Sequence, residues 1–453
     1  MMFPMTFSLR RRAIAAALTL AFAAAANAAP PATPGPTAGA AAASLPEPAA
    51  LPVPTLPAAA RIARVLDAAP SLREAQSLSQ SAAHGAQALR YGSNEVSAQA
   101  QLQQRRVESA PDSGRYAEWQ LALNRQLRLP SQARADNGMA DAMTVSAQAV
   151  AAVARQALLA DALSAWFAAQ RAQAEATLAA DDVALIGRQL HAVQRRQSLG
   201  DASVLEVEQL QAEEARSRST LVMAQGLAES SRSALAARYP ALAQAASPSA
   251  PGTDAGVEPT LPVGSPEALL AGMLERDAVL ARSRAALRQA QAMAAQATAA
   301  RSPQPTVGIY MGSERGGNER IVGLQFALPF GGPARVEQER AALAEADAAR
   351  WRLNDAQMRA RADFERLLAT ARAQAGGAQA MAAAAQAQAR AAERMLRAYQ
   401  LGEAALSDWL VTRRSALDAL RQAQQSRFDA AQSAALVGLQ AGLLFPPAGG
   451  GNG

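Results

Sequence analysis

The sequence predicts a mainly α-helical fold with a small β part and an internal two-fold repeat. Two helical patterns, 135–197 and 335–398, are far longer than an average helix. A pair of segments that alternate apolar and polar residues precedes each long pattern, and such alternation is typical of strands. Each long pattern ends in a short loop with a glycine, Gly200 in the first half and Gly402 in the second.

The N-terminal residues 1–28 are typical of a secretory signal peptide. Arg10, Arg11 and Arg12 form a basic region, the apolar run 13–22 follows, and Ala26-Asn27-Ala28 offers small residues for cleavage. We therefore expect export. Residues 29–61 are rich in Ala and Pro and carry few charges, so we expect a disordered linker there.

The rest of the chain divides into two similar halves, 62–246 and 266–445. Ser, Pro and Gly dominate 247–265, which predicts a linker between the halves, and the Gly-rich end 446–453 predicts a disordered tail. Each half begins with an Ala-rich helix, at about 70–90 and 266–301. The loops correspond residue by residue, because Gly200 and Gly402 are 202 positions apart, and so are Glu206 and Asp408.

Four alternating segments are expected to form two hairpins, with apolar residues at every second position: Val96 to Leu102, Trp119 to Leu123, Val307 to Met311, and Val322 to Leu328. One apolar and one polar face suits a barrel wall between lipid and a lumen. The alternative is an ordinary half-buried hairpin on a soluble sheet. No segment after the signal peptide has about 20 uninterrupted apolar residues, so entry into a membrane would require a barrel.

The long helices have the spacing of coiled coils. Val183, Ile186, Leu190 and Val193 step by three, four and three, and Val150, Val153, Leu159, Leu163 and Trp166 continue the stripe. At 1.5 Å per residue each helix would be roughly 90 Å long, which suits a bundle or a tunnel wall that spans a distance.

Composition argues against several classes of function. The formal charge of +6 is spread among acidic residues and does not cluster with aromatic residues, which argues against nucleic-acid binding. The chain has no cysteine and only two histidines, far apart, so neither a thiolate site nor a histidine metal site is expected. It also lacks the common catalytic motifs. We therefore expect no enzyme, no cofactor and no bound metal.

The chain resembles the TolC family of outer-membrane factors. The residues that carry the resemblance are Tyr399-Gln400-Leu401-Gly402 with Leu406-Ser407-Asp408-Trp409-Leu410, Ala69 to Ala75, and Leu328-Pro329-Phe330-Gly331-Gly332. Two positions depart from the family pattern, Ala405 in place of serine and Trp409 in place of valine. The resemblance implies a homotrimer whose four strands per subunit form one twelve-stranded outer-membrane β-barrel, continued by an α-helical tunnel in the periplasm. It also implies contact with outer-membrane lipid, a periplasmic adaptor protein and a proton-driven inner-membrane pump of the RND type.

Within the family, Gly316 to Gly323 is most similar to the heavy-metal efflux branch, the CzcC and CusC type. The expected function is a passive exit duct, with heavy-metal cations as one possible cargo, although the sequence does not name the substrate. Drug efflux and type I protein secretion are alternatives. A periplasmic adaptor has one helical hairpin where this chain has two, and a purely structural coiled coil would not need the strands.

The hairpin tips are the predicted functional sites. We expect Leu199, Gly200 and Ser203, with Leu401, Gly402 and Ser407, to contact the adaptor; the alternative is that the leucines only close the hairpins. By the resemblance, Asp408 lines the periplasmic entrance, and Glu206 holds the equivalent place in the repeat. The alternative is local, because Ser203 and Glu206 have the spacing of a helix capping box, and Ser407-Asp408 could serve the same end.

Overall fold

The computed structural model describes residues 52–108, 111, 113–243 and 258–446. The predicted signal peptide, most of the predicted linker and residues 447–453 of the predicted tail lie outside these residues. The chain divides into two units, Met1–Ala43 and Ser44–Gly453, and every element below belongs to the second.

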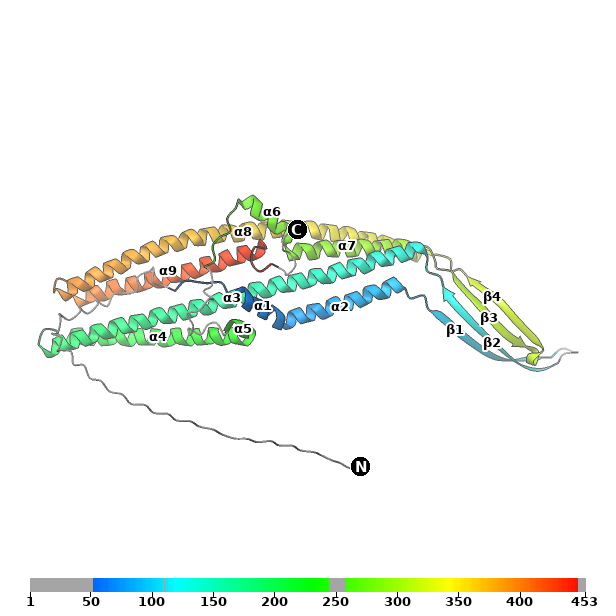
Figure 1. The fold of residues 1–453 in the computed structure, drawn as a ribbon, viewed down its shortest axis with the longest axis horizontal. Coiled ribbons are helices and arrows are strands. Elements are labelled where there is room, and N and C mark those ends of the chain that lie inside the picture. Colours follow the sequence, from blue (N-terminus) through cyan, green and yellow to red (C-terminus); the bar gives the residue numbers. More distant parts are fainter. Residues whose placement is uncertain (1–51, 109–110, 112, 244–257, 447–453) are drawn as a thin grey trace, which may run out of the picture. The chain divides into compact units, whose positions relative to one another are not determined.

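The described elements have the same order in both halves (Figure 1). The first half contains α1 (Ala59–Ala68), α2 (Pro70–Tyr91), β1 (Val96–Val107), β2 (Gly114–Gln126), α3 (Pro130–Ser198), α4 (Val204–Arg238) and α5 (Pro240–Ala243). The second contains α6 (Pro266–Arg276), α7 (Ala278–Ala299), β3 (Thr306–Glu314), the short 3₁₀ helix η2 (Arg315–Gly317), β4 (Glu319–Ala327), α8 (Pro333–Gln400) and α9 (Leu406–Gln440). The series α2-β1-β2-α3-α4 thus recurs as α7-β3-β4-α8-α9.

The two predicted long helices are present and slightly longer than expected. Helix α3 has 69 residues and α8 has 68, each about 100 Å at 1.5 Å per residue. Each begins with proline in its first turn, where a missing N–H is tolerated. Helix α4 runs back along α3, and α9 runs back along α8, so the chain forms two helical hairpins (Figure 1).

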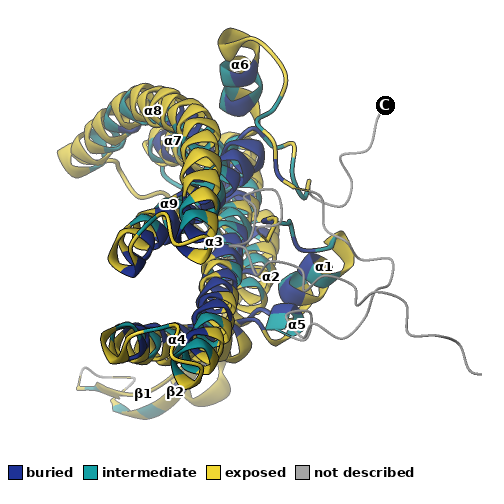
Figure 2. Cartoon of the chain, turned by 90° about the vertical axis from the view of Figure 1, so that its left-hand side faces the viewer, coloured by how far each residue is buried: buried dark blue, intermediate teal, exposed yellow. Residues whose placement is uncertain are grey.

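The predicted apolar stripe on α3 is confirmed over most of its length. Ile186, Leu190 and Val193 are buried, and so are Leu159, Leu163 and Trp166. Val150 is an error of the prediction, because its side chain is 40% exposed. Figure 2 shows α3 as largely buried or half-buried, whereas α8 is largely exposed.

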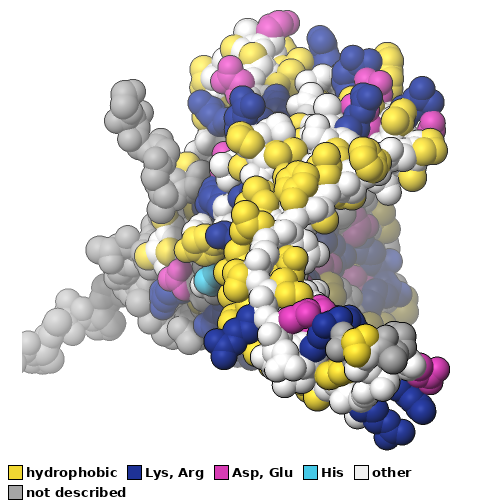
Figure 3. All heavy atoms as spheres, turned by 90° about the vertical axis from the view of Figure 1, so that its right-hand side faces the viewer, with side chains coloured by type: hydrophobic (Ala, Val, Ile, Leu, Met, Phe, Trp, Pro, Cys, Tyr) yellow, Lys and Arg dark blue, Asp and Glu magenta, His cyan; other side chains and the backbone are white. Residues whose placement is uncertain are grey.

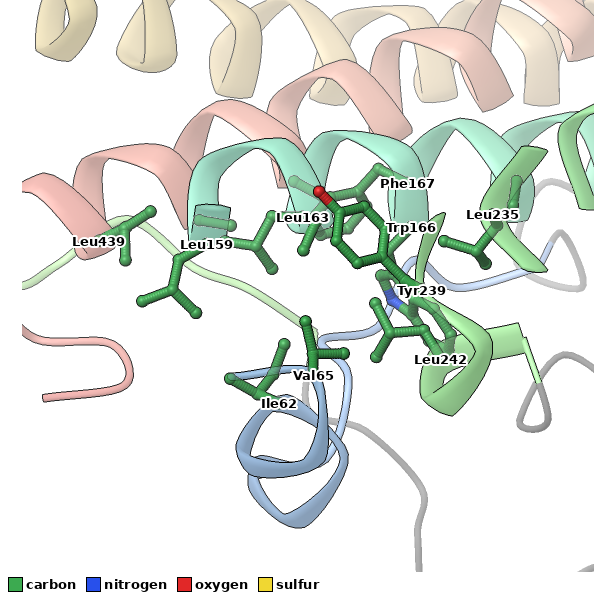
Figure 4. Packing of buried hydrophobic residues seen from close by; sticks show 14 of the residues in the cluster. Ile62, Val65, Leu159, Leu163, Trp166, Phe167, Leu235, Tyr239, Leu242 and Leu439 are labelled. Carbon is green, nitrogen blue, oxygen red and sulfur yellow. The ribbon is translucent and has the colours of Figure 1, made fainter. Parts of the chain in front are cut away.

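The largest apolar cluster joins helices from both halves (Figure 4). Ile62 and Val65 of α1 pack against Trp166 and Phe167 of α3, and Tyr239 and Leu242 of the α5 region close the cluster beside them. Phe428, Ala431, Ala435 and Leu439 bring α9 into the same core.

The predicted linker 29–61 is wrong at its C-terminal end. The Trp166 indole donates a hydrogen bond to the Thr55 carbonyl at 2.7 Å, and the Thr55 amide donates to Gln170 at 3.1 Å. Leu56 packs against the core, and α1 already begins at Ala59. This segment is therefore held by contacts with helices that are distant in the sequence, which composition alone does not reveal.

The predicted single helix 266–301 is two helices. The chain breaks at Asp277, which has an extended backbone (φ −61°, ψ 122°). The Asp277 carboxylate accepts a hydrogen bond from the Leu280 amide at 2.7 Å and thereby caps α7. Before α6, residues 258–265 contain no helix or strand, and Glu258 forms an ion pair with Arg427 at 3.0 Å.

The four predicted strands are confirmed and form one antiparallel sheet in the order β1-β2-β3-β4. The two hairpins are joined by pairing of β2 with β3, in which Ala122 lies opposite Tyr310. Strands β1 and β2 extend further toward their connecting loop than the alternation predicts. Because β1 and β4 each pair with one strand only, the sheet has two open edges within the described chain.

Among the described helices, one, α3, contains an 18-residue window with a mean hydropathy of 1.2, which would suit a membrane span by length and composition only. Alanine provides most of its apolar character, and α3 packs against α2, α4, α7 and α9. We therefore interpret α3 as a helix of the bundle.

Candidate functional site

The two hairpin tips have the same backbone hydrogen bonds. The Asp201 amide donates to the Arg196 carbonyl at 2.9 Å, and the Gly200 amide donates to the Gln197 carbonyl at 3.0 Å. At the other tip the corresponding pairs are Glu403 to Ala398 at 2.9 Å and Gly402 to Tyr399 at 3.1 Å. These bonds define a Schellman motif, which needs a residue with positive φ. Gly200 (φ 85°) and Gly402 (φ 78°) supply it.

The leucines beside these glycines do not close the hairpins. Leu199 is 71% exposed and Leu401 is 74% exposed, so backbone hydrogen bonds rather than leucine packing hold the turns. A Cβ atom added at either glycine would meet nothing within 4 Å. Each tip therefore presents an apolar side chain on a turn with open space around it.

The predicted capping box at the start of α4 is present. The Glu206 amide donates to Ser203 Oγ at 3.2 Å, and the Ser203 amide donates to Glu206 Oε2 at 2.9 Å. The second tip differs, because the residue that precedes α9 is Ala405 and no side chain caps the helix. Ser407 lies exposed in the first turn and does not replace the missing cap.

The two acidic residues at equivalent places therefore have different surroundings. Glu206 Oε1 also accepts a hydrogen bond from the Tyr399 hydroxyl at 3.2 Å, so both of its oxygens are engaged. Asp408 is exposed, and within the described residues its carboxylate has no hydrogen bond or ion pair. Of these two acidic residues, Asp408 is therefore the one whose carboxylate has no partner among the described residues.

An apolar cluster beneath the tips packs the two hairpins together. Tyr399 of α8 and Trp409 of α9 stack with ring centroids 6.4 Å apart and an interplanar angle of 11°. Both side chains are buried against residues of α3 and α4, among them Ile186 and Leu210. Burial raises the pKa of Tyr399, and the negative charge of Glu206 and the hydrogen bond to its carboxylate raise this pKa further.

Further along the same helices lies a buried charged cluster that sequence reasoning missed. Arg413 of α9 is fully buried, where it binds Asp182 of α3 and contacts Glu213 of α4 at 3.1 Å. Ser217 donates to Asp182 at 2.7 Å, and Arg414 Nε donates to Glu213 at 3.1 Å. Burial tends to raise the pKa of Glu213, but the hydrogen bond from Arg414 and the surrounding arginine charges outweigh it and lower the pKa. The cluster fixes α9 against the first hairpin.

A sequence signal for this cluster exists in hindsight. Like charges occur in adjacent pairs on all three helices, at 181–182, 213–214 and 413–414. In each pair one side chain points inward. Because the three pairs lie on three different helices, and the third is about 200 residues beyond the second, the register between the helices is needed to bring them together.

The sheet at the other end of the helices has two distinct faces. Strand pairing places every second residue on one face, which carries the apolar side chains Val96, Leu102, Trp119, Leu121, Leu123, Val307, Ile309, Met311, Val322, Leu324 and Phe326. These side chains are 37–85% exposed. The opposite face carries Gln99, Gln101, Gln103, Gln120, Asn124 and Gln325. Glu118 is buried on this face and accepts a hydrogen bond from Gln103 at 2.8 Å.

Among the described residues, no three His, Cys, Asp or Glu side chains are grouped so that they could hold a metal ion.

The chain has the fold of outer-membrane channel proteins. It is similar to the outer-membrane channel OprN, with a TM-score of 0.71 and 17% identity over 86% of this chain and 90% of that one. It is also similar to the outer-membrane protein VceC from Vibrio cholerae, with a TM-score of 0.68 and 21% identity over 86% of this chain and 100% of the other. A third similar structure is CusC, with a TM-score of 0.66 and 15% identity over 84% and 91%. No protein-family model matches the sequence, and no curated protein has a significantly similar sequence.

Proposed function

We propose that the chain is one subunit of an outer-membrane channel that serves as a passive exit duct, without enzymatic activity, in a tripartite efflux system. The observation that carries the proposal is the pairing of a two-faced, open-edged sheet at one end with two helical hairpins at the other. The similar structures OprN and VceC are described as an outer-membrane channel and an outer-membrane protein, which supports this location.

The sheet supports a membrane-embedded trimer. Four strands per chain are too few for a barrel, because bacterial single-chain barrels start at about eight strands. Three chains that pair β1 of one with β4 of the next would form twelve strands and leave no open edge. The strands have 9 to 13 residues, and about 9–11 tilted residues suffice to span a bilayer. The exposed apolar face would then contact lipid, and the glutamine-rich face would line the lumen.

The internal two-fold repeat belongs to the same proposal, with 62–246 and 266–445 as its two halves. The matched order of elements and the identical backbone bonds at the two tips support it. In a homotrimer the repeat would provide six helical hairpins around the periplasmic tunnel.

The hairpin tips are the proposed contact with the periplasmic adaptor, which links the duct to an inner-membrane pump of the RND type. Leu199 and Leu401 are exposed on rigid turns, as an apolar docking contact requires. Gly200 and Gly402 hold the turns, and Ser407 lies exposed beside the second tip, whereas Ser203 is occupied by its cap.

The entrance is the proposed site of ion selection. In a trimer, three copies of Asp408 would surround the periplasmic mouth, and crowded like charges in a narrow space attract cations and repel anions. Glu206 lies at the equivalent place in the other hairpin, but its carboxylate is bound to Ser203 and Tyr399. Asp408 is therefore the main charged residue of the proposed gate.

The transported substrate belongs to the finer part of the proposal. The Gly316–Gly323 motif favours the hypothesis that the substrates are heavy-metal cations. These residues form the turn at η2 and the start of β4. The TM-score to CusC, 0.66, does not exceed the 0.71 to OprN, so the fold does not favour metal over drug or protein cargo.

Two measurements test the proposed duct. The purified protein should form conducting channels in planar bilayers, and deletion of its gene should sensitise the host to the substrates of a partner pump. A Leu199→Asp, Leu401→Asp double variant should lose resistance but keep channel activity. Val222→Asp on α4, also an exposed apolar residue (66%), is the matched control and should retain resistance.

Bulky residues at Gly200 and Gly402 should likewise abolish efflux and leave membrane insertion intact. The strain would come from the positive φ and not from a clash, since the space around both glycines is open. Normal resistance in both the leucine and the glycine variants would rule out the tips as the adaptor contact.

A further inference from the structure

Charges on the sheet are sorted by face near the loop that joins β1 and β2. The three acidic residues of the strands, Glu118, Glu314 and Glu319, all lie on the polar face. On the apolar face, the charged residues of the strands near this loop are all arginines, namely Arg106 on β1, Arg115 on β2 and Arg320 on β4. All three side chains are exposed. Figure 3, which faces the strand end, shows arginines beside apolar side chains.

Two of these arginines repel each other across the sheet. Arg106 and Arg115 lie directly opposite in the register, where Cα atoms are about 4.5–5.5 Å apart and like charges are destabilising. Arg106 has one weak partner, the highly exposed Glu108 at 3.4 Å. For Arg115 and Arg320, the described part of the chain provides no acidic partner. An anion from outside the chain would relieve this repulsion.

Arg105 shows the contrast on the other face. It lies between Glu118, at 3.3 Å, and Glu314, at 3.5 Å. Arg105 and Arg106 are adjacent on β1, but only Arg105 lies close to two acidic residues of the neighbouring strands. Because successive side chains of a strand point to opposite faces, this difference follows the face of the sheet. The arginines near the loop on the apolar face are the ones without strong acidic partners.

The arginines lie where an embedded sheet would meet lipid headgroups. Arg106 follows Leu102 by four residues, and Arg115 precedes Trp119 by four, which is about 13 Å along a strand. On β4, Arg320 comes immediately before Val322 on the same face. Each arginine thus continues an apolar strip toward the loops, at the depth where guanidinium groups reach the membrane surface.

We propose that Arg106, Arg115 and Arg320 bind phosphate groups of anionic lipid headgroups in the leaflet next to the β1–β2 loop. The planar guanidinium binds phosphate through paired hydrogen bonds, and three arginines whose one acidic partner is the highly exposed Glu108 favour a ligand that carries several negative charges. The inference rests on the proposed function, because the apolar face must be embedded for the arginines to reach the headgroups.

The test uses the full-length detergent-solubilised protein titrated with lipid A, a glycolipid with two phosphates, and followed by native mass spectrometry. Wild type should bind lipid A, and the Arg106→Gln, Arg115→Gln, Arg320→Gln variant should bind it on the order of a hundred-fold more weakly, from roughly five-fold per arginine. Replacement of the three arginines by lysine should restore part of the affinity, because the charge returns without the paired hydrogen bonds.

Controls separate lipid recognition from other effects. Arg105→Gln, on the same strand but the polar face, should bind as wild type does. Inorganic phosphate at the same concentration should not displace the lipid; if it does, the site takes any phosphate anion and the lipid proposal is wrong. Equal lipid A binding by wild type and the triple Gln variant would also overturn it.

Flotation with phosphatidylcholine vesicles tests the embedded sheet separately. All variants should float, because the apolar face inserts without anionic lipid. If wild type does not float, the proposed membrane channel itself fails, and the lipid proposal fails with it. If wild type floats and lipid A does not bind, only the lipid proposal fails.

Discussion

The hydroxyl of Tyr399 donates a hydrogen bond to the carboxylate of Glu206 at 3.2 Å, and these residues are 193 positions apart in the chain. The bond connects the end of α8 with the first turn of α4, and thus one helical hairpin with the other. The same Glu206 carboxylate accepts a hydrogen bond from the Ser203 amide and thereby caps α4. Glu206 therefore both stabilises the start of α4 and connects the first hairpin to the second.

Tyr399→Phe should loosen the contact between the two hairpins at the proposed periplasmic entrance. The substitution removes the hydroxyl but keeps the ring that stacks on Trp409, so stability should fall by only about 0.5–1.5 kcal/mol. The mean channel conductance in planar bilayers should rise, because the tips separate more readily. Tyr91→Phe, at a highly exposed tyrosine of α2, is the control. Unchanged conductance in Tyr399→Phe would show that the bond does not restrain the entrance.

Arg413→Ala should destabilise the protein strongly. The substitution leaves Asp182 buried without its cation, and such uncompensated burial typically costs about 3–5 kcal/mol. The apparent melting temperature, followed by circular dichroism in detergent, should drop clearly. The double variant Arg413→Met, Asp182→Asn removes both charges and should recover much of the loss.

Arg340→Ala is the matched control for Arg413, because Arg340 forms only an exposed ion pair with Glu337. Such pairs contribute about 0–1 kcal/mol. Similar melting temperatures for Arg413→Ala and Arg340→Ala would contradict the role of the buried cluster.

Alkaline pH should destabilise the core around Tyr239. Burial, followed by the hydrogen bond to and charge of Asp161, raises the pKa of Tyr239 from 10.0 to about 12. The unfolded chain therefore releases this proton above pH 10 while the folded chain still holds it, so stability falls as pH rises from about 10 to 12. Urea unfolding across this range should show a steeper loss for wild type than for Tyr239→Phe. Equal slopes would mean that this tyrosine does not control the alkaline transition.

Asp408→Asn should reduce the cation selectivity of the channel more than Glu206→Gln does. Asp408 is free of partners in the described structure, whereas Glu206 is held by Ser203 and Tyr399. Glu206→Gln should keep most of the helix cap, because the glutamine oxygen can still accept the hydrogen bond from the Ser203 amide. Reversal potentials in salt gradients measure selectivity. If the Glu206→Gln, Asp408→Asn double variant keeps full selectivity and block by multivalent cations, the proposed acidic ring is wrong.

The elements that the sequence predicted well are those with strong local patterns. The long helices are rich in alanine and carry apolar residues at helical spacing, and the strands alternate over most of their length, although β1 and β2 continue beyond the alternating segments. Local chemistry also predicted the Ser203–Glu206 capping box, which the structure confirms. The break at Asp277 was missed, because an aspartate within a helical pattern shows its role as a cap only when the backbone is seen to leave the helix.

The features that sequence reasoning missed depend on contacts between distant segments. Val150 fits the apolar stripe of α3 but is 40% exposed, because its burial depends on which helices pack beside that part of α3. Thr55 is held by hydrogen bonds with Trp166 and Gln170 of α3, and Leu56 packs against an apolar cluster to which α1, α3 and α5 contribute. The Arg413 cluster requires the relative register of three helices, which a single sequence does not encode in any local window.

The most direct test of the central claim is disulfide cross-linking between the open edges of the sheet. The chain contains no cysteine, so paired substitutions on β1 and β4, such as Gln101→Cys with Ile321→Cys or Gln325→Cys, can report on contacts between subunits without interference from native thiols. Oxidation in isolated outer membranes should produce covalent dimers and trimers and no larger species, because in the proposed channel three subunits would close a twelve-stranded barrel. Only monomers with every pair, or a ladder that continues beyond three subunits, would contradict the trimeric channel.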